Sequence, residues 1–190
     1  MARWEAGTGS RIQAAAFELF AEHGFAGSTA AAIAERAGVT ERTFFRYFSS
    51  KEELLFADGD AILTELLSAI DEAPLTTDAM GLINAAIDRI CSLFESDRAA
   101  HRVRFEVIAS DQSLIERELL KQSIWTSHLA GAMAKRRVPP GHARLLAAVA
   151  IAAFRVTYEA WLTDRRRTPL ADRVHEALRT LAQELQQTRS

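Results

Sequence analysis

The segment from residue 42 to 48 holds two arginines and four aromatic residues. Guanidinium groups donate hydrogen bonds to phosphate oxygens and to base edges, so this mixture is a candidate for nucleic-acid binding. At about 100° per residue, Phe44 and Phe48 share one side of a helix, and Arg42 and Arg46 share the opposite side. The spacing therefore predicts a helix whose phenylalanines pack in a core while both arginines point into solvent.

Polar residues near this segment extend the candidate contact surface. Thr40 and Thr43 fall where the predicted helix begins, and free backbone amides at such a position favour an anion. Lys51 follows at the beginning of the next predicted element and is a candidate phosphate clamp. Phe45 and Tyr47 flank the apolar side. We expect them either to be partly buried against the first helix or to contact the DNA backbone or a thymine methyl, with a phosphate bond from the Tyr47 hydroxyl.

A first helix over about residues 11–23 is predicted to precede this segment. Ser10 and Gln13 have the spacing of a capping box, and apolar residues then recur at helical intervals. Gly24 is expected to end the helix, because a left-handed residue without a Cβ commonly terminates one. This helix provides an apolar face for the elements that follow.

A second helix over about residues 30–37 and a third over 41–48 complete the predicted arrangement. Gly38 lets the chain turn between them, and Thr40 is expected to cap the third helix. A short helix, a tight turn and a second helix with one apolar and one cationic side are typical of a helix-turn-helix DNA reader.

The remainder of the chain also has helical periodicity, interrupted by few prolines and glycines. Ser50 and Glu53 form a second possible capping box, which predicts one long helix to about residue 70, with a bend at Gly59. Further helices are predicted over about residues 80–94, 101–110, 113–137, 142–163 and 170–185. The fold class expected is all-α, with about nine helices.

Composition and charge restrict the possible functions. The formal charge of −2 means that any nucleic-acid surface must be local, and the single cysteine, Cys91, excludes an internal disulfide. The five histidines form no i, i+4 pair, so no metal site or other cofactor is expected. The beginning of the sequence lacks a signal peptide and no uninterrupted apolar run reaches the length of a membrane span, so we expect a cytoplasmic protein without membrane association.

Residues 24–55 resemble the DNA-binding domain of the TetR family of transcriptional regulators, and residues 10–24 resemble the helix that precedes it. The resemblance implies a DNA-binding domain over 1–52 and an effector-binding and dimerisation domain over 53–190. It also implies a homodimer on a near-palindromic double-stranded operator and release by a small-molecule effector. The positions matching DNA contacts of the family are Thr29, Thr40, Arg42, Thr43, Phe45, Arg46, Tyr47 and Lys51. The family usually has tyrosine at position 45, so Phe45 cannot donate the corresponding hydroxyl bond.

The last two predicted helices, 142–163 and 170–185, carry apolar stripes that are expected to form the homodimer surface, although they could instead cover this chain's own core. Arg155 and Glu159 are expected to pair within one helix or across the dimer. A mixture of aromatic, apolar and a few polar side chains suggests the effector pocket, although simple core packing is the alternative for each. The candidates are Phe94, Arg104, Phe105, Ile108, Trp125, His128, Phe154 and Tyr158.

The sequence also bears on two other functional classes, an enzyme and a protein-binding adaptor. An enzyme is not expected, because no nucleophile, base and orienting group have a spacing that fixes their geometry. A helical adaptor, whose basic surface binds protein and not DNA, is the alternative. For the two arginines themselves the alternative is a solvated face on which Arg42 pairs with Glu41 or Glu35. Salt dependence separates a regulator from an adaptor, because DNA binding weakens log-linearly as the salt concentration rises.

Overall fold

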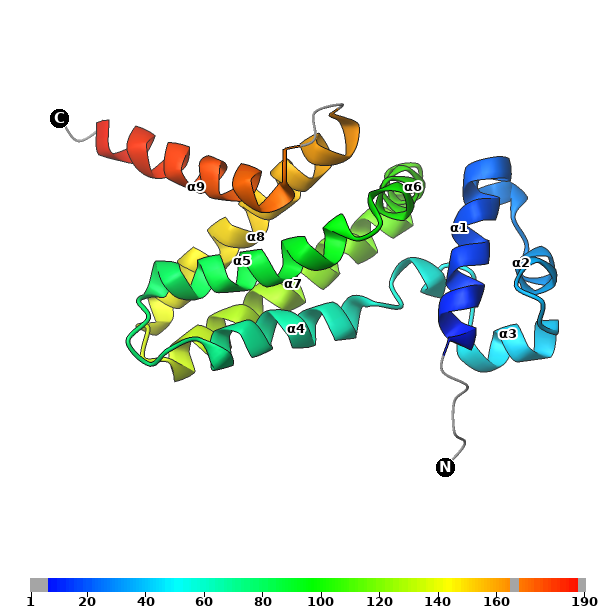
Figure 1. Ribbon diagram of the computed structural model, residues 1–190, viewed down its shortest axis with the longest axis horizontal. Coiled ribbons are helices and arrows are strands. Elements are labelled where there is room, and N and C mark those ends of the chain that lie inside the picture. Colours follow the sequence, from blue (N-terminus) through cyan, green and yellow to red (C-terminus); the bar gives the residue numbers. More distant parts are fainter. Residues whose placement is uncertain (1–6, 165–167, 188–190) are drawn as a thin grey trace. The chain divides into compact units, whose positions relative to one another are not determined.

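The computed structural model of the chain describes residues 7–164 and 168–187 (Figure 1). Within these ranges it contains nine α-helices and one 3-10 helix and no strand, so the predicted all-α fold is confirmed. Residues 1–6, on which the expected absence of a signal peptide partly rests, lie outside the described residues. The chain divides into two compact units.

The first unit consists of the residues up to Asp58 together with Ala99–Glu116. Its elements are α1 (Thr8–Gly27), α2 (Ala30–Arg36), α3 (Glu41–Tyr47), the 3-10 helix η1 (Glu53–Leu55) and most of α6 (Arg98–Ala109). Helix α2 packs against both α1 and α3. Their buried side chains form one core with residues of η1, α6 and the first turn of the helix that begins at Gln112: Ile12, Ala16, Leu19, Phe20, Ile33, Ala34, Phe44, Leu54, Leu55, Val107, Ile108 and Leu114.

The beginning of α1 differs from the prediction. The helix begins at Thr8 after Gly7, and its first turn has no side-chain cap, so the capping box of Ser10 and Gln13 is wrong. The Gln13 amide instead donates hydrogen bonds to the Leu54 carbonyl (3.1 Å) and to the Asp58 carboxylate (2.8 Å). A long polar side chain one turn into a helix can therefore reach a tertiary partner in place of its own helix end.

The end of α1 contains the predicted break. Gly24 has a φ of 71° and a ψ of 166°, and the chain is kinked there before one more turn ends at Gly27. A positive φ is easily reached by glycine because it lacks a Cβ. The prediction that regular helix stops at Gly24 is thus confirmed, and the additional turn leads directly to α2.

The segment after α3 also differs from the prediction. Instead of one long helix opened by Ser50 and Glu53, the chain forms η1 and then begins α4 at Gly59. Leu54 and Leu55 are both almost fully buried, at 0% and 2% exposure. Both side chains belong to the core of the first unit, so the chain at η1 is fixed by packing against that core. Gly59 therefore marks the beginning of a helix and not a bend within one.

Ion pairs hold α2 against α1. The Arg36 guanidinium lies 2.8 Å from a Glu22 carboxylate oxygen and 3.2 Å from one of Glu18. Its hydrogen bond lowers the pKa of Glu22, and the two carboxylates raise the pKa of Arg36. All three side chains are well exposed, so these contacts fix the orientation of α2 more than they add to stability.

The second unit consists of Gly59–Arg98 and the residues from Arg117 onward. Its helices are α4 (Gly59–Glu72), α5 (Ala79–Glu95), most of α7 (Gln112–Lys135), α8 (Pro140–Thr163) and α9 (Leu170–Gln187). Helix α5 is central, because it packs against α4, α8 and α9 (Figure 1). It also buries seven residues along its length: Leu82, Ile83, Ala86, Ile87, Ile90, Cys91 and Phe94.

Helix α8 is apolar over most of its 24 residues. By length and composition it could cross a membrane, and it is the one helix among the described residues that meets this test. No uninterrupted apolar run in the sequence is long enough to predict such a helix. Arg155 and Glu159 interrupt the apolar run. The Arg155 guanidinium lies 3.5 Å from a Glu159 carboxylate oxygen, so the two pair within one helix, which is one of the two predicted alternatives. Only 28% of the apolar window is buried within this chain.

Candidate DNA interface and effector site

Helix α3 is anchored in the first unit by Phe44. This side chain is fully buried, and its ring lies 5.2 Å from that of Phe45 and 6.0 Å from that of Phe48, measured between centroids. Phe48 is the C-cap residue of the helix and is half-buried. The predicted apolar side of the helix is thus confirmed, with Phe44 as its principal buried residue.

The two arginines of α3 face solvent, as predicted. Arg42 and Arg46 are both exposed. Within the described part of the chain the Arg42 guanidinium has no ion pair, so the expected alternative of a bond to Glu41 or Glu35 is not formed. The Arg46 guanidinium carbon lies 5.3 Å from the centre of the Tyr47 ring. Donor groups on both arginines are therefore accessible to an external partner.

Three threonines shape the ends of α2 and α3. The Thr29 hydroxyl accepts a hydrogen bond from the Ala32 amide, and the Thr40 hydroxyl accepts one from the Thr43 amide, both at 3.1 Å. The Thr40 and Thr43 hydroxyls lie 2.9 Å apart. These caps define where each helix begins. The predicted cap at Thr40 is confirmed, and its hydroxyl group stays exposed beside the arginines.

The connection between α2 and α3 is a tight turn. Gly38 has a φ of 67°, and the Val39 amide donates to the Ala34 carbonyl at 2.9 Å. This bond closes the end of α2 in the left-handed form that glycine favours. The predicted helix, glycine turn and helix are therefore all present.

The remaining aromatic residues of α3 have different environments. Phe45 is 50% exposed, which is unusual for a phenylalanine on a small domain. Tyr47 is half-buried and lies against Gly9 of α1, where a Cβ on the glycine would be 3.5 Å from the ring. Of the two expectations, partial burial against the first helix therefore describes Tyr47, and Phe45 is available for contact.

Lys51 has a role inside the protein that the sequence did not reveal. Its ammonium donates to the Phe25 carbonyl at 2.7 Å and to the Ser28 carbonyl at 3.1 Å, and it lies 4.3 Å from the centre of the Phe25 ring. These carbonyls belong to the end of α1 and the residue after it, which lead into α2. The lysine thus holds the chain between α1 and α2, and its predicted contact with phosphate stays a prediction.

The geometry of the first unit agrees with comparisons to known proteins. Residues 12–57 match the family described as bacterial regulatory proteins, tetR family, and residues 77–186 match the MftR C-terminal domain. The chain belongs to the TetR family. This TetR-family chain is a transcriptional regulator with a helix-turn-helix DNA-binding domain, as the resemblance of its residues 24–55 implied.

Two curated relatives and one solved structure illustrate the relationship. The transcriptional regulator MftR of Mycobacterium tuberculosis is 30% identical over 164 residues, covering 83% of this chain and 81% of the relative. The transcriptional activator FasR of Mycolicibacterium smegmatis is 33% identical over 93 residues, covering 48% of this chain and 42% of FasR. FadR from Bacillus subtilis, crystallised with stearoyl-CoA, has a TM-score of 0.65 and 20% identity, covering 90% of this chain and 96% of FadR.

The predicted effector residues of this TetR-family regulator are distributed between its two units. Arg104, Phe105 and Ile108 lie on α6 in the first unit, where Ile108 is part of the core and the Arg104 guanidinium donates to the Leu55 carbonyl at 2.5 Å. The same guanidinium lies 5.5 Å from the centre of the Phe56 ring. The simple packing alternative therefore describes Ile108, and Arg104 is held by a backbone carbonyl.

Three of the other candidates form an aromatic cluster in the second unit. The Phe94 ring of α5 makes edge contacts with Phe154 at 5.4 Å and Tyr158 at 5.2 Å on α8, and these two rings stack at 5.6 Å. Trp125 on α7 is buried beneath the Lys121 ammonium, at 4.8 Å, while His128 is exposed. The cluster is the part of the predicted pocket that the fold brings together, and ligand contact by any of these residues stays a prediction.

Proposed function

We propose that this protein is a homodimeric repressor that occupies a near-palindromic operator and is released by a small-molecule effector. The observation that carries the proposal is the arrangement of α3, where a fully buried Phe44 holds the helix and Arg42 and Arg46 face solvent. Arginine donates bidentate hydrogen bonds to guanine and to phosphate, and each good base contact contributes roughly 1 to 3 kcal/mol of discrimination.

The local charge favours DNA even though the whole chain is slightly acidic. Between residues 41 and 51 the cations are Arg42, Arg46 and Lys51 and the one anion is Glu41, which gives 3 − 1 = +2. Two copies double the number of phosphate contacts, so DNA affinity should fall more steeply with rising salt concentration than it would for one copy. A single copy makes too few contacts for specific affinity.

The homodimer is proposed to form through α8 and α9. Leu145 and Val156 of α8 are 63% and 58% exposed, and Leu181 and Leu185 of α9 are 42% and 62% exposed. Such an apolar surface is unfavourable in water, and pairing it with a symmetry mate would give a four-helix bundle. The apolar length of α8 then reflects a protein interface and not a membrane span.

Repression and release follow from geometry in this proposal. The two recognition helices must be about 34 to 36 Å apart to enter successive major grooves. An effector bound in the second unit would stabilise a conformation with a different spacing of the recognition helices, so the two DNA-binding domains could no longer bind the operator together. Losing one of the two DNA-binding domains from the complex lowers DNA affinity by roughly two to four orders of magnitude.

A gel-shift titration with DNA upstream of the protein's own gene tests DNA recognition. Arg42→Ala and Arg46→Ala should each weaken binding by about tenfold or more, because each removes base or phosphate contacts in both subunits. Arg102→Ala is the matched control, since Arg102 is an exposed arginine of the same unit and pairs only weakly with Glu106 at 3.7 Å. Wild-type affinity in both α3 variants would refute the assignment and favour the adaptor alternative.

Sedimentation velocity tests the dimer. Val156→Glu should shift the protein from dimer to monomer and weaken DNA binding, because it places a charge on the proposed apolar interface. Leu119→Glu is the control, as Leu119 is 51% exposed on α7, outside that interface. A monomeric wild type, or a dimer that Val156→Glu does not affect, would contradict the proposed interface.

The direction of regulation needs a separate measurement, because the relative FasR is named an activator. Deleting the gene should raise expression from a reporter carrying its own upstream DNA, and a fall would identify an activator. A thermal-shift screen for the effector should include acyl-CoA thioesters, since FadR was crystallised with stearoyl-CoA. Likeness at 20% identity supports the fold alone, so hydrophobic acids and drug-like cations belong in the same screen.

A further inference from the structure

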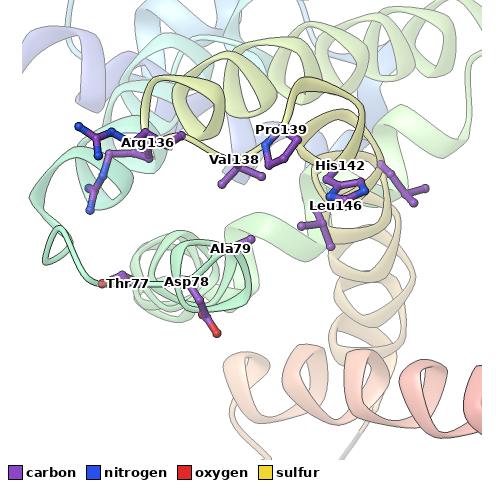
Figure 2. A pocket seen from close by; sticks show the side chains of 10 residues that line it. Thr77, Asp78, Ala79, Arg136, Val138, Pro139, His142 and Leu146 are labelled. Carbon is purple, nitrogen blue, oxygen red and sulfur yellow. The ribbon is translucent and has the colours of Figure 1, made fainter.

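A pocket of about 550 Å³ lies in the second unit, at the corner where α7 leads into α8 and beside the beginning of α5 (Figure 2). Val138 and Pro139 of the corner form part of its wall, and Figure 2 shows Leu146 of α8 facing the same space. The volume lies within the range of small-molecule sites, and these three side chains offer an apolar surface. None of the predicted effector residues lines this pocket.

Three residues with cationic or imidazole side chains also line the pocket, and they differ in availability. The Arg136 guanidinium donates to the Asp71, Ala73 and Pro74 carbonyls at 3.4, 2.8 and 2.6 Å, and also to the Ile70 carbonyl. It is therefore committed to the end of α4. The side chains of Arg137 and His142 have no hydrogen-bond or ion-pair partner anywhere in the described ranges.

Arg137 also occupies an unusual backbone position. Its φ of 68° makes it the one residue other than glycine with a positive φ among those the structure describes. The position follows the end of α7, where the Val138 amide donates to the Met133 carbonyl at 3.2 Å, and glycine is the residue that normally fills such a cap. An arginine there strains the backbone, and an observed strain of this kind motivates a functional hypothesis.

Asp78 is the one carboxylate in the pocket lining, and its single negative charge does not balance the two positive charges of Arg136 and Arg137. Asp78 accepts a hydrogen bond from the Gly81 amide at 2.8 Å and thereby caps the beginning of α5. Figure 2 shows its side chain at the start of α5, across the pocket from His142 and Leu146. The lining therefore combines an apolar wall with a net cationic side.

We propose that this pocket binds a small molecule that joins an apolar chain to a carboxylate or phosphate group. Arg137 contacts the anionic group, and the apolar chain packs on Val138, Pro139 and Leu146. The site is separate from the effector residues predicted on α6 to α8. Ligand binding to this pocket is measured without DNA. A negative result would therefore leave the proposed DNA-binding function unaffected.

Isothermal titration calorimetry of the full chain with octanoate and with octyl phosphate tests the site, and 1-octanol tests the need for a charge. We expect at least one anion to bind and octanol to bind at least tenfold more weakly, since a hydrogen bond between charged groups contributes about tenfold or more in affinity. The stronger of the two anions identifies the head group, carboxylate or phosphate.

Arg137→Gly separates a ligand role from a structural one. It should weaken anion binding about tenfold or more while leaving Tm unchanged or raised by about 2 to 4 °C, because glycine tolerates the left-handed backbone. Lys135→Gln, which removes a neighbouring exposed charge outside the pocket, should preserve affinity. Leu146→Trp should weaken the same probe by filling the apolar part.

Two results would overturn the proposal. One is that neither octanoate nor octyl phosphate binds, or that octanol binds as tightly as they do. The other is that Arg137→Gly retains wild-type affinity, and a fall in its Tm would then assign Arg137 a purely structural role.

Discussion

Replacing Lys51 with methionine separates two roles that one ammonium group could have. Lys51→Met keeps the apolar stem and removes the charge that binds the Phe25 and Ser28 carbonyls at 2.7 and 3.1 Å. We expect the protein to be less stable, because the Phe25 and Ser28 carbonyls lose the ammonium that donates to both of them and so joins Lys51 to the connection between α1 and α2.

The size of the effect follows from the contacts. A hydrogen bond from a charged donor contributes about 1.5 to 3 kcal/mol, and the half-exposed position of Lys51 favours the lower value for each of the two bonds. The ammonium above the Phe25 ring adds about 0.5 to 1 kcal/mol. The total is about 3.5 to 4 kcal/mol, which for a chain of this length lowers Tm by about 7 to 16 °C.

The assay combines thermal unfolding with DNA binding at several salt concentrations. If the ammonium acts inside the protein, the salt slope of binding stays at its wild-type value even where affinity falls. If it contacts phosphate, the slope decreases by about 0.9 for each subunit. An unchanged Tm together with a decreased slope would refute the structural role. Arg102→Met, at an exposed position of the same unit, is the control for both measurements.

Three further predictions concern buried or helix-capping groups. Phe44→Ala should lower the free energy of unfolding in urea by about 3 to 5 kcal/mol and weaken DNA binding, because it empties a fully buried ring position beneath α3. Arg136→Ala should lower Tm by about 2 to 8 °C, since the carbonyls at the end of α4 lose their donor. Burial, with smaller contributions from Glu95 and Asp88, raises the pKa of Cys91 to about 12. Iodoacetamide should therefore label the native protein at pH 8 about a thousandfold more slowly than an ordinary thiol, and unfolding in urea should restore labelling; fast native labelling would contradict the burial.

The sequence predicted the recognition helix in detail because its information is local. Residues four apart share a helix face, so Phe44 inside and Arg42 and Arg46 outside follow from spacing alone. Gly38 and Thr40 act on the backbone within a few residues of themselves, which is why the turn and the cap were also predictable. The regulator family follows from the same short stretch.

Residues 50 to 59 show where local rules stop being sufficient. Ser50 and Glu53 have capping spacing, yet the chain forms a short 3-10 helix with Leu54 and Leu55 both buried in the core, and α4 begins only at Gly59. Gln13 similarly reaches Leu54 and not its own helix end. Tertiary packing decides such cases because it gains more than a single cap contributes.

The sequence by itself determined the all-α fold, the helix-turn-helix and the solvent-facing arginines, since helical periodicity and turn chemistry are encoded within about ten residues. Only the tertiary structure decided that Lys51 binds carbonyls 23 and 26 residues earlier, and that Ile108 is part of the first unit's core. It also decided that Arg137 lines a pocket with residues of α5 and α8. These pairings depend on which helix faces meet, and no local pattern in the sequence specifies that.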